Sequence, residues 1–456
     1  MRIRGVPGLL PALVYGAFAV FGLAVVAVST QPLHRLWGAW AAGTYCAAAL
    51  LSLARFRWRR QVVLAVTVAG ALIVPLCWLA ATGQGMPEVG VVEHSAALLT
   101  QHGRPYQSAA QLGADVNGYN PYLPGMTLFG LPHALFGGGV ATDPRVWDGI
   151  AFVLLFWAAL RVAGCGSPVR RTGLLASSPL IAFPLTVSGN DLPVVGLLCL
   201  GLALASGAAG SRPVMAGIVL GAASALKATA WPALLVVGVL LAARGRFGAA
   251  AAAVLAVVAG PFLLIQPRDL FDNTIAFPLG LTKAHSPAAS PLPGHLLAAT
   301  GQAGHLAVIA LMASAALGIG VALLVRPPRT VVAAAGYLAL VLTLLFMLAP
   351  ATRWGYFVYP LGIACWLCLS GLVQPASAWW RQAGEEDLER LRADLPWPGE
   401  RVVQIADQDQ RYDDDRGEQP DHDHVHPGIG QAEQEREADG NRAAADQGDP
   451  QECWHA

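Results

Sequence analysis

Charged residues are scarce in this chain. Asp, Glu, Lys and Arg make up 13% of its 456 residues, whereas hydrophobic residues make up 55%. A soluble protein of this length would not need many long apolar runs, and about 20 apolar helical residues cross the ~30 Å hydrocarbon layer of a membrane. The composition therefore excludes an ordinary soluble domain and predicts an all-α polytopic membrane protein. Uninterrupted runs without charge occupy 8–29, 61–82, 304–325 and 330–350.

The chain also lacks the cysteine pattern of a disulfide framework. Nearly all of its seven cysteines lie in or beside apolar runs, where cysteine behaves as a small hydrophobic residue. Cys365 and Cys368 have the spacing of a redox motif, but they lie in a predicted membrane helix. We find no internal repeat and no clear signal-peptide cleavage site, so we interpret the first apolar run as a retained span.

The arginines are unevenly distributed among the connections. Since cytoplasmic loops carry the excess of Lys and Arg, we place inside Arg2, Arg4, 55–60, 161–171, Arg212, 244–246 and 326–329. The connections then left outside are 83–122, 189–190, a break near Lys227, 267–303 and 351–353. This alternation predicts about 12 crossings of the plasma membrane, with both termini in the cytoplasm and the active face outside.

One segment disturbs that alternation. Residues 123–140 are apolar but rich in Gly and Pro. If this segment crossed together with 146–163, the arginines at 161–171 would face outward. Either 123–140 enters the membrane without crossing it, or the charge rule fails at that loop.

The composition changes again near residue 374. Residues 381–456 are acidic and Gln-rich, so they cannot bury enough apolar surface to fold. We therefore predict N-terminal transmembrane helices at 1–82, an extracytoplasmic loop with an amphipathic helix at 83–122, a transmembrane core at 123–373 and a disordered cytoplasmic tail at 374–456. The run Asp421-His422-Asp423-His424 could hold a metal loosely, but ligands on an unfolded segment lack the outer hydrogen bonds that fix a metal site. We predict no metal and no cofactor.

The polar segment 85–106 predicts an amphipathic helix on the outer face. Pro87 suits the first turn of a helix. At 100° per residue Glu88 falls in the middle of the apolar face, while Glu93 lies on the wet face. A partly desolvated Glu88 would serve as a general base. The alternative is a first-turn acid favoured by the helix dipole.

Other outer-side residues also carry two interpretations. Asn190 and Asp191 either form a turn or place a second carboxylate in the same cavity as Glu88. Lys227 interrupts a long apolar run, where it either reaches the interface or binds an anion. Arg353 either anchors the chain at the interface or grips a phosphate, which its planar fork matches. Tyr106, Tyr119 and Tyr122, with Asn120 among them, form an aromatic entry to the next apolar segment, and aromatic residues suit a membrane interface and a sugar equally well. Tyr356 and Tyr359 lie beside Arg353 in the sequence.

Five pieces in order resemble the GT-C membrane glycosyltransferases, most closely glycosyltransferase family 87, whose members include polyprenol-phosphate-mannose-dependent mannosyltransferases. They are Glu88 through Gly103-Arg104-Pro105-Tyr106, "YNPYLPGMTLFGLP", "SGNDLPVVGLLCLGLALA", "AGIVLGAASALKATAWP" and Pro350 through Tyr356. The resemblance spans about 83–372. The family more often has Asp at the position of Glu88, Tyr-Pro-Pro for Tyr-Asn-Pro, and a Gly-Gln-x-Asn break for Gly-Asn-Asp.

The resemblance implies a GT-C-like fold and an inverting hexosyltransferase that uses a polyprenyl-phosphate sugar, with mannose as the expected hexose. The acceptor would be a lipid or glycan on the outer face, and membrane lipids, but no nucleic acid, would be partners. Glu88 and Asp191 would be the catalytic carboxylates, and no Asp-x-Asp motif for a metal occurs in the outer loops. The substrate-binding residues would be Arg353, Lys227, Tyr106, Tyr119, Asn120, Asn190, Tyr356, Glu93 and His285.

Two other functions remain open at this point. A transporter or flippase of a lipid-linked substrate would also have broken helices and a lysine at membrane depth. It predicts paired repeats in the two halves, which we do not find. An inactive structural member of an envelope-assembly complex is the third interpretation, and chemistry rather than sequence separates it from an enzyme.

Overall fold

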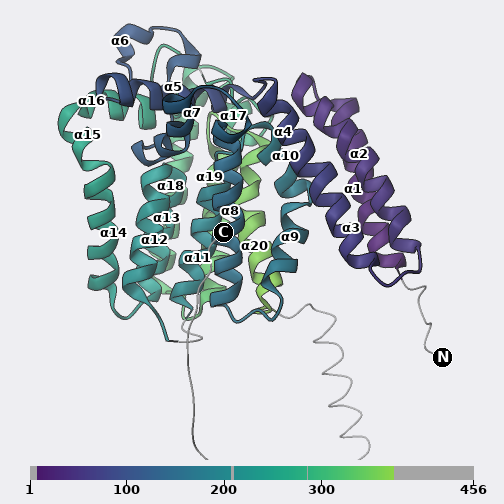
Figure 1. Cartoon of the computed structure of the whole chain (residues 1–456). Helices are drawn as coiled ribbons and strands as arrows, with labels where there is room; N and C mark the ends of the chain where they lie inside the picture. The colour runs from purple at the N-terminus through teal and green to yellow at the C-terminus, as the bar shows by residue number, and fades with distance from the viewer. Residues whose placement is uncertain (1–7, 207–209, 285, 374–456) are drawn as a thin grey trace, which may run out of the picture. The chain divides into compact units, whose positions relative to one another are not determined.

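The computed structural model describes residues 8–206, 210–284 and 286–373 (Figure 1). The chain divides into the units Met1–Trp379 and Trp380–Ala456, and the fold concerns the first. Within the described ranges the structure is helical, and extended pairing is limited to an isolated bridge between Ala289 and Thr352. The prediction of an all-α protein is confirmed. The predicted tail at 374–456 and the candidate His285 lie outside the described residues.

The N-terminal helices pack through glycine and one indole hydrogen bond. They are α1 (Leu9–Val28), α2 (Pro32–Leu53), α3 (Arg59–Val68), the π-helical η1 (Ala69–Ile73) and α4 (Val74–Ala81). A Cβ on Gly22 would lie 2.9 Å from the carbonyl oxygen of Gly38, so α1 and α2 approach closely. Pro75 has no N–H for the carbonyl of Ala71. The Trp37 Nε1 donates to that carbonyl instead, at 2.9 Å.

The helices of the core surround α11 (Leu192–Ala205), which is buried along most of its length. It packs against α8, α12, α19 and α20. The other core helices are α8 (Pro144–Val162), α9 (Pro168–Ala176), α10 (Pro179–Val187), α12 (Pro213–Leu226), α13 (Trp231–Leu240), α14 (Arg244–Val258), α15 (Gly260–Ile265), α18 (Gln302–Val325), α19 (Val331–Leu348) and α20 (Val358–Ser370).

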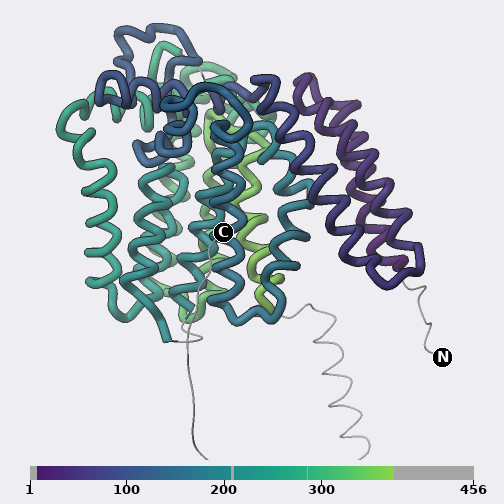
Figure 2. Tube along the Cα trace, viewed as in Figure 1, coloured from purple at the N-terminus to yellow at the C-terminus, as the bar shows by residue number. Residues whose placement is uncertain are grey.

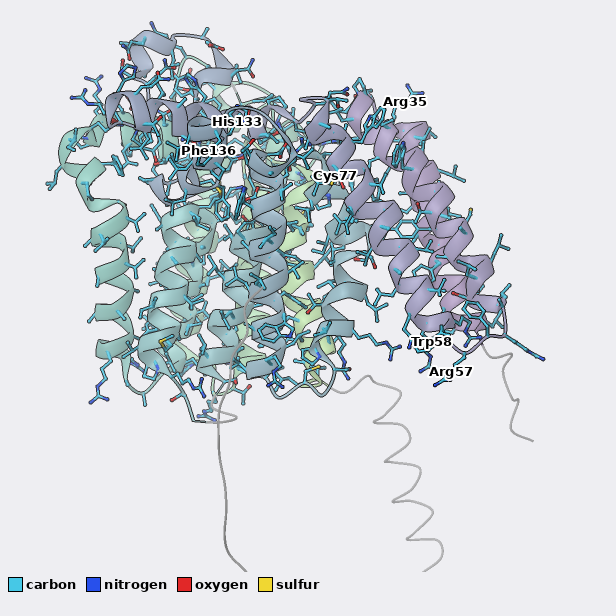
Figure 3. The ribbon with its side chains drawn as sticks, viewed as in Figure 1. Arg35, Arg57, Trp58, Cys77, His133 and Phe136 are labelled. Atoms are coloured by element: carbon cyan, nitrogen blue, oxygen red, sulfur yellow. The ribbon has the colours of Figure 1, made fainter. Side chains whose placement is uncertain are left out.

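Short helices gather at one end of these long helices (Figures 1 and 2). His133 and Phe136 lie at this end, whereas Arg57 and Trp58 of an arginine-rich loop lie at the other (Figure 3). The elements of this end, together with the breaks that follow α12 and α19, are α5 (Pro87–His102), α6 (Ala109–Leu112), η2 (Val116–Gly118), η3 (Pro124–Gly130), α7 (Leu131–Phe136), η4 (Val140–Thr142), η5 (Ala228–Ala230), α16 (Pro267–Phe271), η6 (Asp272–Ala276), α17 (Pro293–Ala298) and η7 (Trp354–Phe357).

The segment 123–140 does not form a spanning helix. It folds as η3, which has seven residues, and α7, which has six, and a single span needs about 20. Both pack against α5, and α8 begins beside them. A Cβ on Gly130 would lie 2.4 Å from the carbonyl oxygen of Val92, which explains the glycine at this contact. The arrangement favours entry without crossing.

Among the described residues, five helices are long and apolar enough to cross a membrane. They are Leu9–Val28, Pro32–Leu53, Arg59–Ala81, Gln302–Val325 and Val331–Leu348. Shorter apolar helices follow at Leu192–Ala205, Pro213–Leu226, Ala228–Leu240 and Trp354–Ser370. A membrane protein is supported, while the count of about 12 crossings and the orientation stay predictions.

Candidate active site

A cavity of about 300 Å³ opens at the end where the short helices gather. Six of the residues singled out from the sequence line it: Glu88, Tyr119, Tyr122, Lys227, Arg353 and Tyr356. They come from α5, the loop before η3, the break after α12, and the loop after α19. An apolar wall of Met312, Leu345 and Phe346 completes one side. Segments distant in the sequence therefore converge on one space that holds a carboxylate and two cations.

Glu88 and Arg353 form an ion pair in this cavity. Arg353 donates through a terminal guanidinium nitrogen to Glu88 Oε1. Both side chains are about three-quarters buried. The second carboxylate oxygen of Glu88, Oε2, is buried and has no hydrogen-bond partner within the described residues. One oxygen of this carboxylate is therefore engaged by Arg353, and the other is left without a partner among the described residues.

The backbone around Arg353 is fixed by the loop that precedes α17. Thr352 donates from its backbone N–H to the carbonyl of Ala288 at 2.8 Å, and it accepts from Ser290 N at 2.9 Å. The His295 ring contacts the carbonyl of Pro350, with 2.9 Å between Nδ1 and O. These contacts hold the turn between α19 and η7, so movement of Arg353 is confined mainly to its side chain.

Lys227 stands at a helix break. It follows the last residue of α12 with an extended backbone (φ −154°, ψ 136°), and Pro232 opens α13 shortly after η5. Its Nζ pairs with Asp191 Oδ1. The ring centroids of Tyr122, Tyr356 and Tyr359 lie 5.3, 5.0 and 5.9 Å from Nζ. Aromatic faces attract a cation at this distance, so the ammonium group sits in an aromatic cage.

Asp191 lies behind Lys227 rather than in the lining of the cavity. The hydroxyl of Tyr359 donates to the same Oδ1 at 2.7 Å. This carboxylate is thus committed to two donors on the protein. Its arrangement suits holding Lys227 in place, whereas Glu88 faces the cavity directly.

Asn190 joins the break after α10 to α5. Its Nδ2 donates to the backbone carbonyl of Glu88 at 2.9 Å and to the hydroxyl of Tyr122 at 3.3 Å. The neighbouring Gly189 has φ +80°, and a Cβ there would lie 2.8 Å from Asp148 Oδ2. Glycine is required by both the backbone and the space. The break therefore positions the first turn of α5, which carries Glu88.

A buried asparagine that sequence analysis missed holds the segment between α5 and η3 beside the cavity. Asn273 accepts from Asn120 N at 2.9 Å, and its Nδ2 donates to the carbonyls of Gln107 and Asp269. Tyr119 stacks on Phe277 with 4.7 Å between centroids. Asn273 lies in the predicted outer loop 267–303, where an uncharged residue gave no distinguishing signal.

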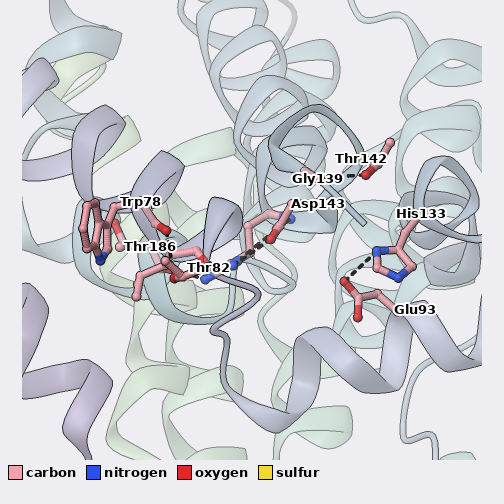
Figure 4. Close-up of polar contacts among 10 residues, drawn as sticks. Trp78, Thr82, Glu93, His133, Gly139, Thr142, Asp143 and Thr186 are labelled. Carbon is pink, nitrogen blue, oxygen red and sulfur yellow. Dashed lines mark hydrogen bonds and ion pairs between the residues drawn. The ribbon is translucent and has the colours of Figure 1, made fainter. Parts of the chain in front are cut away.

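Two other candidates lie away from the cavity. The hydroxyl of buried Tyr106 donates to the carbonyl of Tyr122 at 2.8 Å, which supports the loop from behind. Glu93 points toward α7, where its Oε1 lies 3.2 Å from Nδ1 of His133 (Figure 4). Burial raises the pKa of Glu93, while His133 opposes that shift. The structure therefore places this second glutamate of α5 in a separate polar contact.

The comparison with protein families identifies the chain. Residues 120–350, just over half of it, match the model of glycosyltransferase family 87. The chain belongs to glycosyltransferase family 87. Comparisons with curated proteins and with solved structures found no match. The matched residues include Asn120, Asn190, Asp191 and Lys227 but not Glu88 or Arg353, which the fold brings to the same cavity.

This family 87 chain also contains a buried charged cluster that sequence analysis did not select. Arg145 donates through Nε and one terminal nitrogen to both oxygens of Asp143, at 2.9 and 2.7 Å, and through the other to the carbonyl of Thr186 at 2.8 Å (Figure 4). Asp148 is fully buried beside Gly189. The sequence did carry a signal for this cluster, since Asp143, Arg145 and Asp148 are three charged residues within an otherwise apolar stretch.

A metal centre is not assembled in the part of this family 87 chain that the structure describes, since no group of three or more His, Cys, Asp or Glu side chains converges there. The expectation of a metal-free reaction stays a prediction. Positive charge at the cavity comes from Lys227 and Arg353.

Proposed function

We propose that this family 87 glycosyltransferase moves a hexose, mannose in the first instance, from a polyprenyl-phosphate sugar to a hydroxyl of a lipid or glycan acceptor. The reaction takes place on the outer face of the plasma membrane and inverts the anomeric centre. The observation that carries the proposal is the convergence of Glu88, Lys227 and Arg353 on one cavity with an apolar wall. A general base and two phosphate-binding cations are what this transfer needs.

The donor phosphate binds between Arg353 and Lys227. The guanidinium offers a planar fork of donors that matches phosphate oxygens, and the lysine offers a point charge held by Asp191. The prenyl chain lies along Met312, Leu345 and Phe346, on the side formed by α18 and α19. Tyr119 and Tyr356 present aromatic surface to the sugar. Two cations stabilise the charge that develops on the leaving phosphate.

Glu88 accepts the proton of the acceptor hydroxyl through its unpartnered Oε2. The acceptor oxygen forms a bond to the anomeric carbon from the face opposite the phosphate. The bond between that carbon and the phosphate oxygen breaks, and its electron pair leaves with the phosphate. Asp191 contributes by fixing Lys227, and Asn190 contributes by fixing the first turn of α5.

The test is sugar transfer by purified protein in nanodiscs. Polyprenyl-phosphate mannose and an acceptor lipid extract are supplied, and products are followed by mass spectrometry. Glu88→Gln should lose roughly 10²–10⁴ of the rate, the range for removing a general base. Glu93→Gln, on the same helix but away from the cavity, is the matched control and should retain most activity. Transfer that survives in folded Glu88→Gln would assign the base to another residue, and failure with every polyprenyl-phosphate hexose would reject the donor class.

A further inference from the structure

The two ion pairs beside the cavity differ in how firmly they are held. Asp191 Oδ1 binds both Lys227 and Tyr359, and this carboxylate does not line the cavity. In the other pair both Glu88 and Arg353 line the cavity, and Glu88 Oε2 has no partner among the described side chains. A ligand entering the cavity therefore meets one pair whose two members are both within reach.

In this pair, which lines the cavity, each member occupies a group that the other needs for its proposed role. The guanidinium occupies one oxygen of the Glu88 carboxylate. Glu88 in turn occupies a donor of Arg353 that would otherwise bind phosphate. Each residue is restrained by the other while the cavity holds no anion.

We infer that Arg353 changes partner during the reaction, from Glu88 to the phosphate of the donor, and so couples proton removal to departure of the leaving group. This inference rests on the proposed function. Arg353 is suited to the exchange because its side chain carries five N–H donors on a backbone fixed by Ala288 and Ser290. Lys227, held by Asp191, stays in place and keeps the phosphate near the cavity.

The charges on the two partners change in opposite directions. A polyprenyl-phosphate sugar is a phosphodiester that carries one negative charge. The released polyprenyl phosphate is a monoester that carries about 1.5 to 2 negative charges. When Glu88 takes the proton of the acceptor hydroxyl, the carboxylate loses its charge. The phosphate gains charge as the bond to the sugar breaks. The guanidinium can follow this charge by rotation of its own side chain, with no further ion or co-reactant.

The experiment measures phosphate binding without requiring turnover. Farnesyl phosphate is titrated into protein in nanodiscs, and uncharged farnesol is titrated as a control for the prenyl chain. Because Glu88 competes with phosphate for Arg353, Glu88→Gln should bind farnesyl phosphate roughly tenfold more tightly. Arg353→Gln should bind it roughly tenfold more weakly. In the double variant the gain from Glu88→Gln should disappear, and farnesol binding should be unchanged throughout.

Glu93→Gln is the matched control and should leave both affinities unchanged. Glu88→Asp, which draws the carboxylate back by one methylene, is a second variant and should also tighten farnesyl phosphate binding. Unchanged or weaker binding by folded Glu88→Gln would overturn the inference, as would a gain that persists in the double variant. The binding titration does not depend on sugar transfer. It can therefore reject the partner exchange of Arg353 without rejecting the proposed activity, and the transfer assay can reject the activity without rejecting the exchange.

Discussion

The side-chain amide of Asn190 donates to the backbone carbonyl of Glu88 at 2.9 Å, although 102 positions separate the two residues. The break after α10 therefore sets the position of the first turn of α5. Backbone groups of the same two segments also meet, since Met86 N donates to the carbonyl of Val187 at 3.0 Å. The proposed base depends on a helix break that is remote in sequence.

Asn190→Ala removes the donor to Glu88 and to Tyr122. We expect a loss of about 1–3 kcal/mol in the free energy of unfolding, since the carbonyl of Glu88 is left without this partner. Sugar transfer should also fall, because the first turn of α5 is no longer fixed. Thermal unfolding and transfer assays measure both effects. Gln101→Ala, exposed near the other end of α5, should change neither.

Gly189→Ala and Gly90→Ala form a matched pair of glycine replacements. The first introduces a Cβ at φ +80° and 2.8 Å from Asp148 Oδ2, so we expect destabilisation of about 1–3 kcal/mol. The second lies within α5, where a Cβ meets no described atom within 4 Å, and helix propensity should make it neutral or stabilising by up to ~1 kcal/mol. Equal unfolding temperatures for the two variants would contradict this account of Gly189.

Arg145→Ala tests the buried charged cluster. The change leaves Asp143 buried without its partner and frees the carbonyl of Thr186, so we expect a loss of about 3–5 kcal/mol. Arg268→Ala is the control, because Arg268 is exposed and pairs with Asp272 at 3.8 Å. Exposed pairs contribute about 0–1 kcal/mol. Chemical unfolding of both variants gives the comparison, and similar losses would refute the importance of burial.

Glu93 should make stability depend on pH in a definite direction. Burial raises its pKa above the ordinary value of 4.5, with His133 and Arg145 opposing the shift and Asp143 adding to it. The folded protein therefore binds this proton more tightly than the unfolded chain. The contribution to stability is present at low pH and falls as the pH rises from 4.5 through the raised pKa. Unfolding measured across this range should show a smaller fall in Glu93→Gln than in the parent protein.

The helix α5 illustrates how much the sequence predicted. Pro87 correctly indicated its start, and the structure has it at Pro87–His102. The buried residues of this helix are Val89, Val92, Ser95 and Ala96. Packing by η3 and α7 decides which face is buried, and local periodicity carries no information about those partners.

The pairings in the site were beyond sequence reasoning. Glu88 and Arg353 were both selected, but 265 positions separate them, and their contact arises only from the fold. Tyr359 was noted as an aromatic neighbour, while its bond to Asp191 had no local signal. The crossing count was harder still, because Lys227 and Asn190 interrupt helices that are shorter than a full span.

The indole of Trp37 and the hydroxyl of Tyr45 tie α2 to the helices that follow it. The indole satisfies the carbonyl of Ala71 that Pro75 leaves open, and Tyr45 of the same helix donates to the carbonyl of Ser177 at 2.6 Å. In hydrocarbon, a bare carbonyl costs several kcal/mol. A shortened chain that begins after residue 53 would therefore leave these two carbonyls without their donors, and we expect it to be less stable than the full chain.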